Sequence, residues 1–374
     1  MSERLGVISP ESRRFIPPEL VAGRGWDRLV RRVGELPGWP VLNRVFFEFG
    51  LGDPAPAADF SVRVYPGHPG LPGHYVHRGK TAQQNSAAAA LGRFLSEAAD
   101  TRTVSESALS ARFNDIMLEY DIAGIESEAS PDPGLFLGLR PAASPDDSEV
   151  GSPGNVVAEL TNAVGWNDDA GERRILERVV GALPPGGRLD HVGAMPGRPF
   201  RAVRAIVNGI APEEMPVFLE RAGWPGSVRN VMDALADWRD VFPYFRPCFD
   251  ASARGLRPRL GLEMFPRSER KGRWPVGDWL STGIRTWLPV LERLEERELC
   301  LPAKGSGLRV FPGMEQLFDK DGVYILHKGL NHVKLAIEDG GVQAKAYAGL
   351  RLLRFGPDGR ESPESGDAHS RLAG

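Results

Sequence analysis

The residues best suited to chemistry are two lysines, a histidine and a tyrosine near the end of the chain. The segment 329–353 reads GLNHVKLAIEDGGVQAKAYAGLRLL, in which polar and apolar residues alternate. His332, Lys334, Lys345 and Tyr347 all fall on the polar side, because neighbouring residues of a β-strand point to opposite faces. Ammonium and imidazole groups on one surface can bind an anion. This segment is therefore a candidate site for a carboxylate or a diphosphate.

A tight Asp-Gly turn at 339–340 joins the two strands of this predicted hairpin. Both central positions of a type I′ turn need a positive φ, which Asp-Gly supplies readily. With such a turn, Lys334 lies opposite Lys345 and His332 lies opposite Tyr347. Two ammonium groups directly across a ladder repel each other. They are tolerated when the polar face is simply solvated, and they are useful when a bound anion separates them.

Lysine is rare in this chain, which makes its local concentration informative. The sequence has 46 Lys plus Arg, yet lysine occurs only at positions 80, 271, 304, 320, 328, 334 and 345. Four of these seven lie between Lys320 and Lys345. Lysine supplies a compact point charge, whereas arginine supplies a planar fork. The cluster favours a role that arginine would not fill equally well.

The composition is that of an ordinary globular protein. Of 374 residues, 41% are hydrophobic and 25% are charged, and the net charge is −3. A protein with this charge balance has no strong overall electrostatic attraction to nucleic acid or to a membrane surface. The N-terminus lacks the apolar core of a signal peptide, and no apolar run is long enough to span a bilayer. We expect a cytoplasmic protein with neither nucleic acid nor membrane as a partner.

Sequence signatures of cofactors and covalent catalysis are missing. Cys248 and Cys300 are flanked by apolar residues and are predicted to be buried. His68, His74 and His77 lie in a Gly/Pro-rich segment, and their spacing fits no regular metal site. Neither a glycine-rich nucleotide loop nor a Gly-x-Ser-x-Gly elbow occurs. We predict no metal, no cofactor and no identifiable catalytic residue.

The order of predicted elements indicates an α+β protein in which antiparallel sheets are packed with helices. Alternating strands and amphipathic helices occur without regular βαβ order. A run rich in Pro, Ser, Asp and Gly at 141–153 divides the chain. We predict an N-terminal half at 1–150 of unassigned role, a C-terminal half at 151–355 that carries the basic hairpin, and a disordered tail at 356–374.

Two pairs of short, similar segments within the sequence, called echoes below, indicate that the two halves of the chain are related. Residues 119–141 and 248–266 each place an Asp near the end of a strand and Leu-Gly-Leu after the following loop. The segment AVGW at 163–166 likewise resembles AGW at 222–224. Matches of this length also arise by chance, so related halves and coincidence both stay open.

Several short blocks in the second half resemble a known group of proteins. The blocks are GWPG at 223–226, RPRLGLE at 257–263, LCLPAK at 299–304, FPG at 311–313, and the hairpin strands at 331–335 and 344–347. In this order they resemble bacterial accessory proteins of ribosomal peptide natural-product pathways, of the crocagin-pathway type. The resemblance covers roughly 199–353. It implies a non-catalytic protein that binds a precursor peptide and presents it to the tailoring enzymes of the same pathway.

In such a protein, the hairpin would hold an extended peptide by edge-strand addition. Lys334, Lys345 and His332 would meet acidic side chains or a C-terminal carboxylate, and Tyr347 would stack on the peptide. The further candidate peptide-binding residues are Arg204, Arg259, Glu263, Trp274 and Trp279. The two tryptophans lie in a polar segment, where this residue type favours contact with a partner.

An enzyme is the alternative. Antiparallel αββα prenyltransferase barrels line their interiors with Lys, Arg and Tyr at alternating strand positions to hold a prenyl diphosphate. Lys334, Lys345, Tyr347 and Arg204 could serve in this way, and the chain length also fits. However, the chain has only six tyrosines, and the predicted strand at 113–122 is acidic. The sequence therefore favours the binding protein over the enzyme.

Overall fold

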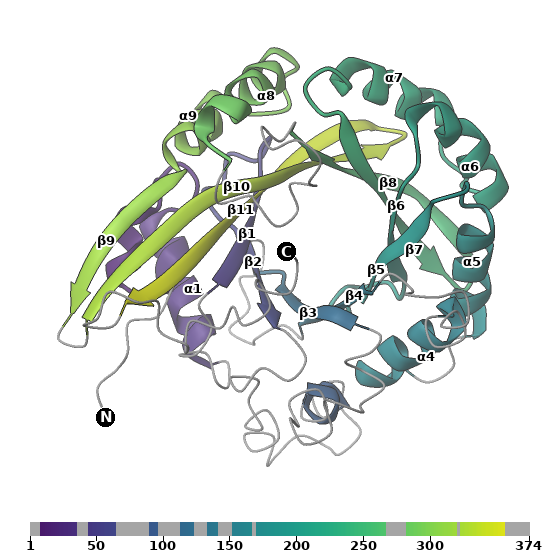
Figure 1. Ribbon diagram of the computed structural model, residues 1–374, viewed down its shortest axis with the longest axis horizontal. Coiled ribbons are helices and arrows are strands. Elements are labelled where there is room, and N and C mark those ends of the chain that lie inside the picture. Colours follow the sequence, from purple (N-terminus) through teal and green to yellow (C-terminus); the bar gives the residue numbers. More distant parts are fainter. Residues whose placement is uncertain are drawn as a thin grey trace.

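Antiparallel strands close into a ring in the computed structural model of this chain (Figure 1). The structure describes residues 8–35, 44–64, 90–95, 113–122, 133–140, 152–166, 170–266, 282–319 and 322–355. The ring strands within these ranges are β1 (Arg44–Gly50), β2 (Asp59–Val64), β3 (Phe113–Tyr120), β4 (Gly134–Leu139), β5 (Arg188–Ala194), β6 (Val203–Asn208), β7 (Tyr244–Ser252), β8 (Gly255–Phe265), β10 (Gly322–Glu338) and β11 (Gly341–Phe355). Each pairs with its neighbours, and β11 pairs with both β1 and β10, which closes the barrel. An additional strand, β9 (Gly313–Asp319), pairs with β10.

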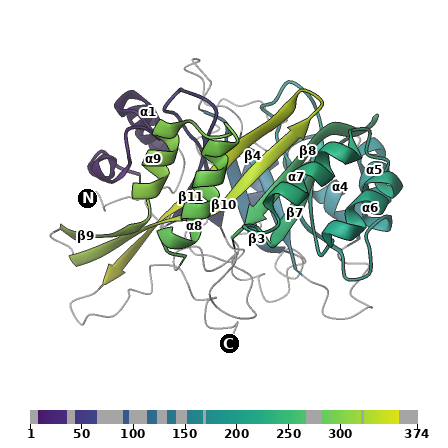
Figure 2. The ribbon, with the colours of Figure 1, turned by 90° about the horizontal axis from the view of Figure 1, so that it is seen from above.

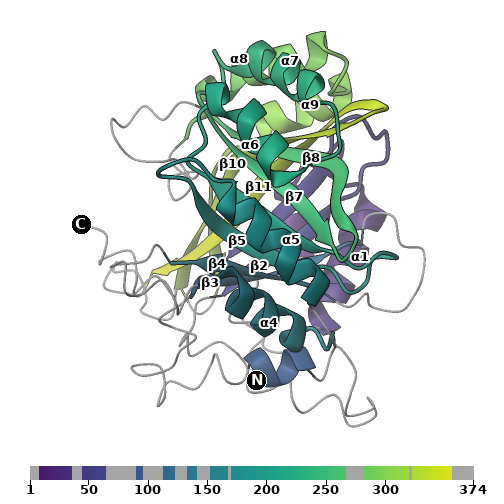
Figure 3. The ribbon, with the colours of Figure 1, turned by 90° about the vertical axis from the view of Figure 1, so that its right-hand side faces the viewer.

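The helices lie outside the ring. They are η1 (Glu11–Phe15), α1 (Gly23–Glu35), α4 (Pro153–Ala163), α5 (Ala170–Gly181), η5 (Pro212–Glu214), α6 (Met215–Ala222), α7 (Val228–Trp238), α8 (Ile284–Glu296) and α9 (Pro302–Val310), together with a helical stretch at 90–95. Figure 2 shows α8 and α9 beside the outer surface of the barrel, and Figure 3 shows α4, α5 and α6 over the strands of the middle of the chain. Pairs of helices thus precede pairs of ring strands along the chain.

The predicted mixture of helices and antiparallel strands is confirmed, but the predicted arrangement as sheets packed with helices is corrected to a closed barrel. The segment predicted as a linker, 141–153, does not interrupt the sheet, because β4 pairs with β5 across it. Both halves of the chain contribute strands to the same ring. The predicted tail at 356–374 lies outside the described residues. Alternation along a strand predicts two different faces, but it does not say whether the polar face meets bulk solvent or the inside of a barrel.

The sequence echoes occupy equivalent places in the repeating pattern of helices and strands. The echo at 119–141 begins in β3 and includes β4, and the echo at 248–266 includes the greater part of β7 and β8. The two Gly-Trp segments each follow a first helix, α4 or α6, of a helix pair. In the described residues, two helices precede the strand pairs β5–β6 and β7–β8, whereas a single helical stretch at 90–95 is described before β3 and β4.

The hydrophobic core lies between the barrel wall and the surrounding helices. On β1, Val45, Phe47 and Phe49 are fully buried on the outer side, and the Phe47 ring lies 6.1 Å from the Trp26 ring of α1. The residue between the two phenylalanines, Glu48, faces the barrel interior. On β1, helix packing therefore stabilises the outer side of the wall, while Glu48 and also Phe46 face the interior.

Local sequence signals explain where the helices begin and end. Ser152 precedes α4 and its hydroxyl accepts the N–H of Asn155, while Ser227 precedes α7 in the same way. Gly223 ends α6 with a φ of 69°, in the left-handed region that favours glycine. Capped ends satisfy backbone groups that would otherwise lack partners. None of the helices in the described ranges combines the length and apolarity needed to cross a bilayer.

The predicted register of the C-terminal hairpin is confirmed. Lys334 pairs with Lys345, and His332 pairs with Tyr347. The tight turn follows Glu338, which pairs with Gly341. A bulge between Leu330 and His332 shifts the register only beyond this region.

Gly193 should be needed for packing inside the barrel. It pairs with Phe136 across β4 and β5, and a Cβ at position 193 would lie 2.2 Å from the Phe136 ring. We expect Gly193→Ala to lower the free energy of unfolding by about 1–3 kcal/mol, because the ring or the strand must move. Urea denaturation measures this change. The control is Gly181→Ala, where a Cβ meets nothing within 4 Å. Equal midpoints for the two variants would contradict the close contact.

Candidate functional site

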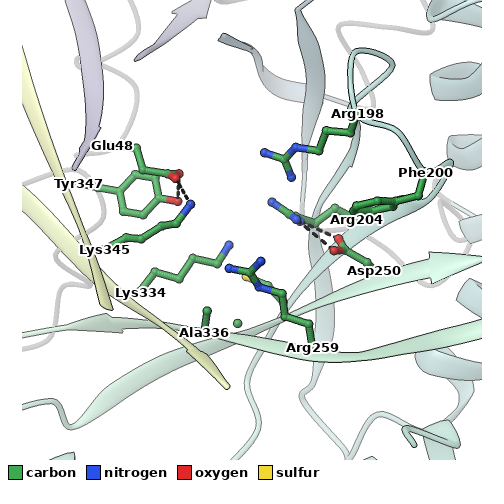
Figure 4. A pocket seen from close by; sticks show the side chains of 12 residues that line it. Glu48, Arg198, Phe200, Arg204, Asp250, Arg259, Lys334, Ala336, Lys345 and Tyr347 are labelled. Carbon is green, nitrogen blue, oxygen red and sulfur yellow. Dashed lines mark hydrogen bonds and ion pairs between the residues drawn. The ribbon is translucent and has the colours of Figure 1, made fainter. Parts of the chain in front are cut away.

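The interior of the barrel gathers charged and polar side chains from strands that are far apart in the sequence. They line two adjoining cavities, whose shared residues are Arg204, Lys334 and Tyr347. The larger cavity has a volume of about 210 Å³. Its walls carry five cations and two acids, together with smaller or apolar residues: Arg198, Arg204, Arg259, Lys334, Lys345, Glu48, Asp250, Tyr347, Phe200, Cys248, Gly261 and Ala336 (Figure 4).

Glu48 is the carboxylate at one side of the larger cavity. The Lys345 ammonium and the Tyr347 hydroxyl both donate hydrogen bonds to it. Burial alone would raise the pKa of Glu48, but the charge and hydrogen bond of Lys345, with the bond from Tyr347, lower that pKa to about 2. Glu48 is therefore ionised at neutral pH.

Lys334 is the cation that remains most available to a ligand. Its side chain is largely buried, and Figure 4 shows it pointing into the cavity. The acid nearest to it, Glu263, lies 3.8 Å from Nζ, beyond hydrogen-bond distance. Gly261 makes room for the lysine, because a Cβ there would lie 2.5 Å from Lys334 Cε. Within the described residues, the ammonium group thus has a nearby countercharge but no hydrogen-bond acceptor.

The arginines around the cavity are already paired with acids of the chain. Arg204 binds Asp250 through two hydrogen bonds of 2.8 and 3.1 Å. Arg259 lies 3.1 Å from Glu338. Because a guanidinium group has five N–H donors, each arginine keeps donors beyond those used in its pair. The pairs hold the guanidinium groups in place without exhausting their capacity to bind an anion.

Arg198 brings two further acids to the edge of the site. It donates to Asp121 at 2.7 and 3.0 Å and to Glu119 at 3.3 Å. Burial, followed by the charge of Glu48, raises the pKa of Glu119 to about 7, although Arg204 and Arg198 oppose this rise. Glu119 can therefore gain or lose a proton near neutral pH.

The smaller cavity, of about 60 Å³, is lined by apolar side chains and by charged ones, among them Arg63, Glu119 and His191. The apolar side chains are Phe46, Met117, Phe136 and Ile206. His332 also borders the cavity, and burial lowers its pKa to about 3, so that its ring is neutral. A short apolar group would be accommodated beside the charged cavity.

The His332 ring is held by its neighbours. It stacks on Tyr347 with ring centroids 4.1 Å apart, and its Nδ1 donates to the Asn331 side chain at 2.7 Å. Its Nε2 is buried and has no hydrogen-bond partner in the described part of the chain. The neutral ring therefore offers a hydrogen-bond acceptor inside the barrel.

A second charged network contributes His191, Arg246 and Glu263 to the lining of the smaller cavity. His191 lies 3.1 Å from Asp190 and 3.8 Å from Asp115. Arg246 bridges Asp190 and Glu263, each at 2.6 Å. Burial would lower the pKa of His191, but Asp115 and Asp190 outweigh that effect and raise it to about 9. The imidazolium is charged at neutral pH.

The structure brings together many of the residues predicted from the sequence. Lys334, Lys345, Tyr347, Arg204 and Arg259 line the larger cavity, and His332 and Glu263 line the smaller one. Trp274 and Trp279 lie outside the described residues, as do His68, His74 and His77. Among the side chains that are described, no group of three could hold a metal ion.

The expectation of an exposed basic face on the hairpin is corrected. The polar face turns into the barrel, where Lys334 is buried and Lys345 is bound to Glu48. Both edges of the hairpin are also occupied in the described sheet, since β11 pairs with β1 and β10 pairs with β8 and β9. In the described sheet, edge-strand addition of a peptide therefore has no free edge along 345–351 of β11 or along 322–328 and 333–337 of β10.

Sequence reasoning missed several residues of the site. Glu48, Arg198, Asp250, Glu119 and His191 were not singled out. One signal was available for Glu48, because it is the single acid in the otherwise apolar strand VFFEFG. A charged residue at an alternate position of such a strand indicates an inward-facing polar role. The other residues could be recognised only after the ring had been closed.

No protein-family model matches this chain, and a search of curated proteins finds no match.

The charge on His191 should make stability fall in alkaline solution. Its pKa is raised from 6.5 to about 9, so the ion pairs contribute fully below pH 6.5 and are lost as the pH rises through 9. We expect a loss on the order of 3 kcal/mol in the free energy of unfolding across this range. Urea denaturation at a series of pH values measures it. Glu119, whose pKa is about 7, titrates in the lower part of this range, and comparison with a variant that lacks His191 separates its contribution.

The control for this prediction is His191→Asn. This variant should be less stable at neutral pH, because Asp115 and Asp190 lose a buried countercharge. Between pH 7 and pH 9 its stability should fall much less than that of the unmodified protein, because the His191 ion pairs are absent. If the same alkaline slope persists in the variant, another group is responsible for it.

Proposed function

We propose that this barrel transfers a prenyl group from a prenyl diphosphate to a nucleophilic acceptor, as αββα prenyltransferase barrels do. The proposal is supported by one observation above all. A closed antiparallel barrel places guanidinium and ammonium groups from several strands around one internal cavity beside an ionised carboxylate. The enzyme, which the sequence made the less favoured alternative, is the function that fits this geometry best.

The cationic wall would bind the diphosphate. Lys334 supplies N–H donors that have no acceptor among the described residues, and Arg204 and Arg198 supply guanidinium groups held by acids. Hydrogen bonds between such cations and phosphate oxygens are strong, and they are stronger inside a cavity than in water. They would stabilise the negative charge that develops on the diphosphate as its C–O bond breaks.

Aromatic rings near this wall would stabilise the allylic carbocation that remains. The faces of aromatic rings attract cations. Tyr347 lines both cavities, and Phe46 and Phe136 line the smaller one. The smaller cavity measures about 60 Å³, whereas one water needs roughly 10–15 Å³ in the same measure. Its size therefore suits a short chain such as a dimethylallyl group.

Glu48 would take the proton released by the acceptor. The carbocation forms a bond to a carbon, nitrogen or oxygen atom of the acceptor, and the acceptor then loses its proton. Glu48 is ionised and faces the same cavity, so it can accept this proton directly or through a water. Lys345 and Tyr347 hold the carboxylate in position. The products are the prenylated acceptor, diphosphate and one proton on the enzyme.

The precursor peptide implied by the sequence resemblance fits this proposal as an acceptor. A peptide side chain could receive the prenyl group in the cavity while the rest of the peptide stays outside. A protein that binds the peptide without modifying it is the contrasting outcome of the same experiment.

Product formation should depend on Glu48. We expect incubation with dimethylallyl diphosphate and aromatic or peptide acceptors to give products one prenyl group heavier, detected by mass spectrometry. Glu48→Gln should lower kcat by about 10²–10⁴-fold, because the base is removed while the diphosphate site is kept. Glu213→Gln, at a helix start outside the barrel, is the matched control and should be fully active. Absence of any prenylated product, with peptide bound unchanged, would favour the binding protein.

Diphosphate binding should depend on Lys334. We expect Lys334→Met to weaken the binding of inorganic pyrophosphate at least tenfold in isothermal titration calorimetry, or about 1.4 kcal/mol. The matched control is Lys328→Met on the same strand. Lys328 is also buried, but it lies on the helix-covered side, 3.0 Å from Glu315. This control should lose stability and keep its affinity. No measurable binding of pyrophosphate to the unmodified protein would remove the diphosphate site.

A further inference from the structure

A carboxylate of the chain binds one of the cations that face the larger cavity. Arg198 lines that cavity and donates a hydrogen bond of 3.3 Å to Glu119, a residue of β3 that lines the smaller cavity. Arg198 also donates to Asp121 at 2.7 and 3.0 Å. Glu119 is 9% exposed, whereas the side chain of Asp121 is 33% exposed. Glu119 is therefore the more deeply buried of the two acids that hold Arg198.

Arg198 and Arg204 are neighbouring cations on one side of the larger cavity. Figure 4 shows both side chains reaching into the cavity from that side. Like charges repel each other, and an anion beside them relieves the repulsion. Asp250 binds Arg204, while Asp121 and Glu119 bind Arg198. Glu119 thus supplies, from within the chain, negative charge of the kind that a diphosphate would bring.

The surroundings of Glu119 make its ionised form only marginally favourable at neutral pH. Burial, followed by the charge of Glu48, raises its pKa to about 7 against the opposing charges of Arg204 and Arg198. Within the described residues, the titratable or charged groups that line the smaller cavity with Glu119 or interact with its charge are Glu48 on β1, Arg63 on β2, Asp121 after β3, His191 on β5, Arg198 after β5, Arg204 on β6, Arg246 on β7, Glu263 on β8, His332 and Lys334 on β10, and Tyr347 on β11. The pKa of His332 is about 3 and that of His191 is about 9, so the two histidines titrate outside the interval from pH 6 to pH 8.

We propose that Glu119 competes with the diphosphate for Arg198 when it is ionised, and that it takes up a proton when the diphosphate binds. This inference rests on the proposed diphosphate site. A bound diphosphate places further negative charge near a buried carboxylate, which favours the neutral form of that carboxylate. Once Glu119 is neutral, more of the Arg198 charge is available to the phosphate oxygens. One proton passes from solvent to the Glu119 carboxylate as the anion enters, and it returns to solvent as the anion leaves.

The affinity of the site for pyrophosphate should therefore fall as the pH rises through 7. Ionised Glu119 has to gain a proton for the anion to bind, and this gain becomes less favourable at higher pH. The pKa of Glu119 is about 7 in the free protein, and the proposal places it well above 8 in the complex. On this basis the affinity falls about tenfold between pH 6 and pH 8, and binding takes up roughly half a proton at pH 7 and close to one at pH 8.

Isothermal titration calorimetry with inorganic pyrophosphate at pH 6, 7 and 8 tests this linkage. Phosphate groups themselves titrate near pH 6, so the measured quantity is the difference between the unmodified protein and Glu119→Gln. Glutamine has the size and shape of protonated glutamic acid. The variant should therefore match the unmodified protein at pH 6 and bind pyrophosphate about tenfold more tightly at pH 8. Titrations in two buffers of different ionisation enthalpy count protons, and the variant should take up about one fewer at pH 8.

The matched control is Glu295→Gln. Glu295 also binds an arginine, Arg309, but this pair joins the outer helices α8 and α9, so the variant should keep the pH dependence of the unmodified protein. Equal pH dependence and equal proton uptake in the unmodified protein and Glu119→Gln would overturn the role of Glu119 and leave the diphosphate site standing. Absence of pyrophosphate binding to the unmodified protein at pH 6 would remove the diphosphate site, and the role of Glu119 with it.

Discussion

Closure of the ring by β11 determines which side of every strand meets water. β11 pairs with β1 on one side and with β10 on the other, so no ring strand keeps an open edge. Once the ring is closed, the apolar side of each strand can be buried only against helices, and the polar side must face the interior. Phe47 and Glu48 illustrate this division, because they are neighbours in the chain and lie on opposite sides of the wall. The internal site follows from this single constraint.

The interior then has to accommodate charge away from bulk water. A buried ion is stable only when a countercharge and hydrogen bonds accompany it. The chain supplies acids for its interior cations: Asp250 for Arg204, Glu48 for Lys345, and Asp190 with Glu263 for Arg246. Lys334 departs from this pattern, since its nearest acid is 3.8 Å away and already serves Arg246. Lys334 therefore presents its ammonium group to the larger cavity without a hydrogen bond to any acid of the described residues.

Parts of this arrangement could be predicted from the sequence, and the reasons are local. The Asp-Gly turn and strict alternation predicted that Lys334 faces Lys345 and that His332 faces Tyr347, because hairpin register depends on neighbouring residues alone. The end of α6 at Gly223 likewise has a local reason, because glycine readily adopts the left-handed region there. By contrast, the pairing of β1 with β11 joins the two ends of the chain, and no short pattern encodes it. For that reason the sequence did not identify Glu48, which accepts hydrogen bonds from Lys345 and Tyr347 across this pairing. For the same reason, the basic face of the C-terminal hairpin was expected on the outside of the molecule.

The pairing of Arg44 with Arg351 has a consequence for synthesis of the protein on the ribosome. Of the described strands, β1 is synthesised before the other ring strands, but its neighbour β11 follows only after about three hundred more residues, which takes roughly 15–60 s at 5–20 residues per second. During that interval the outer margin of β1 is an unpaired strand edge in a growing, incomplete sheet. Late ring closure of this kind slows folding and exposes the nascent chain to aggregation. β11 thus both completes the internal chamber and removes the unpaired edge of β1.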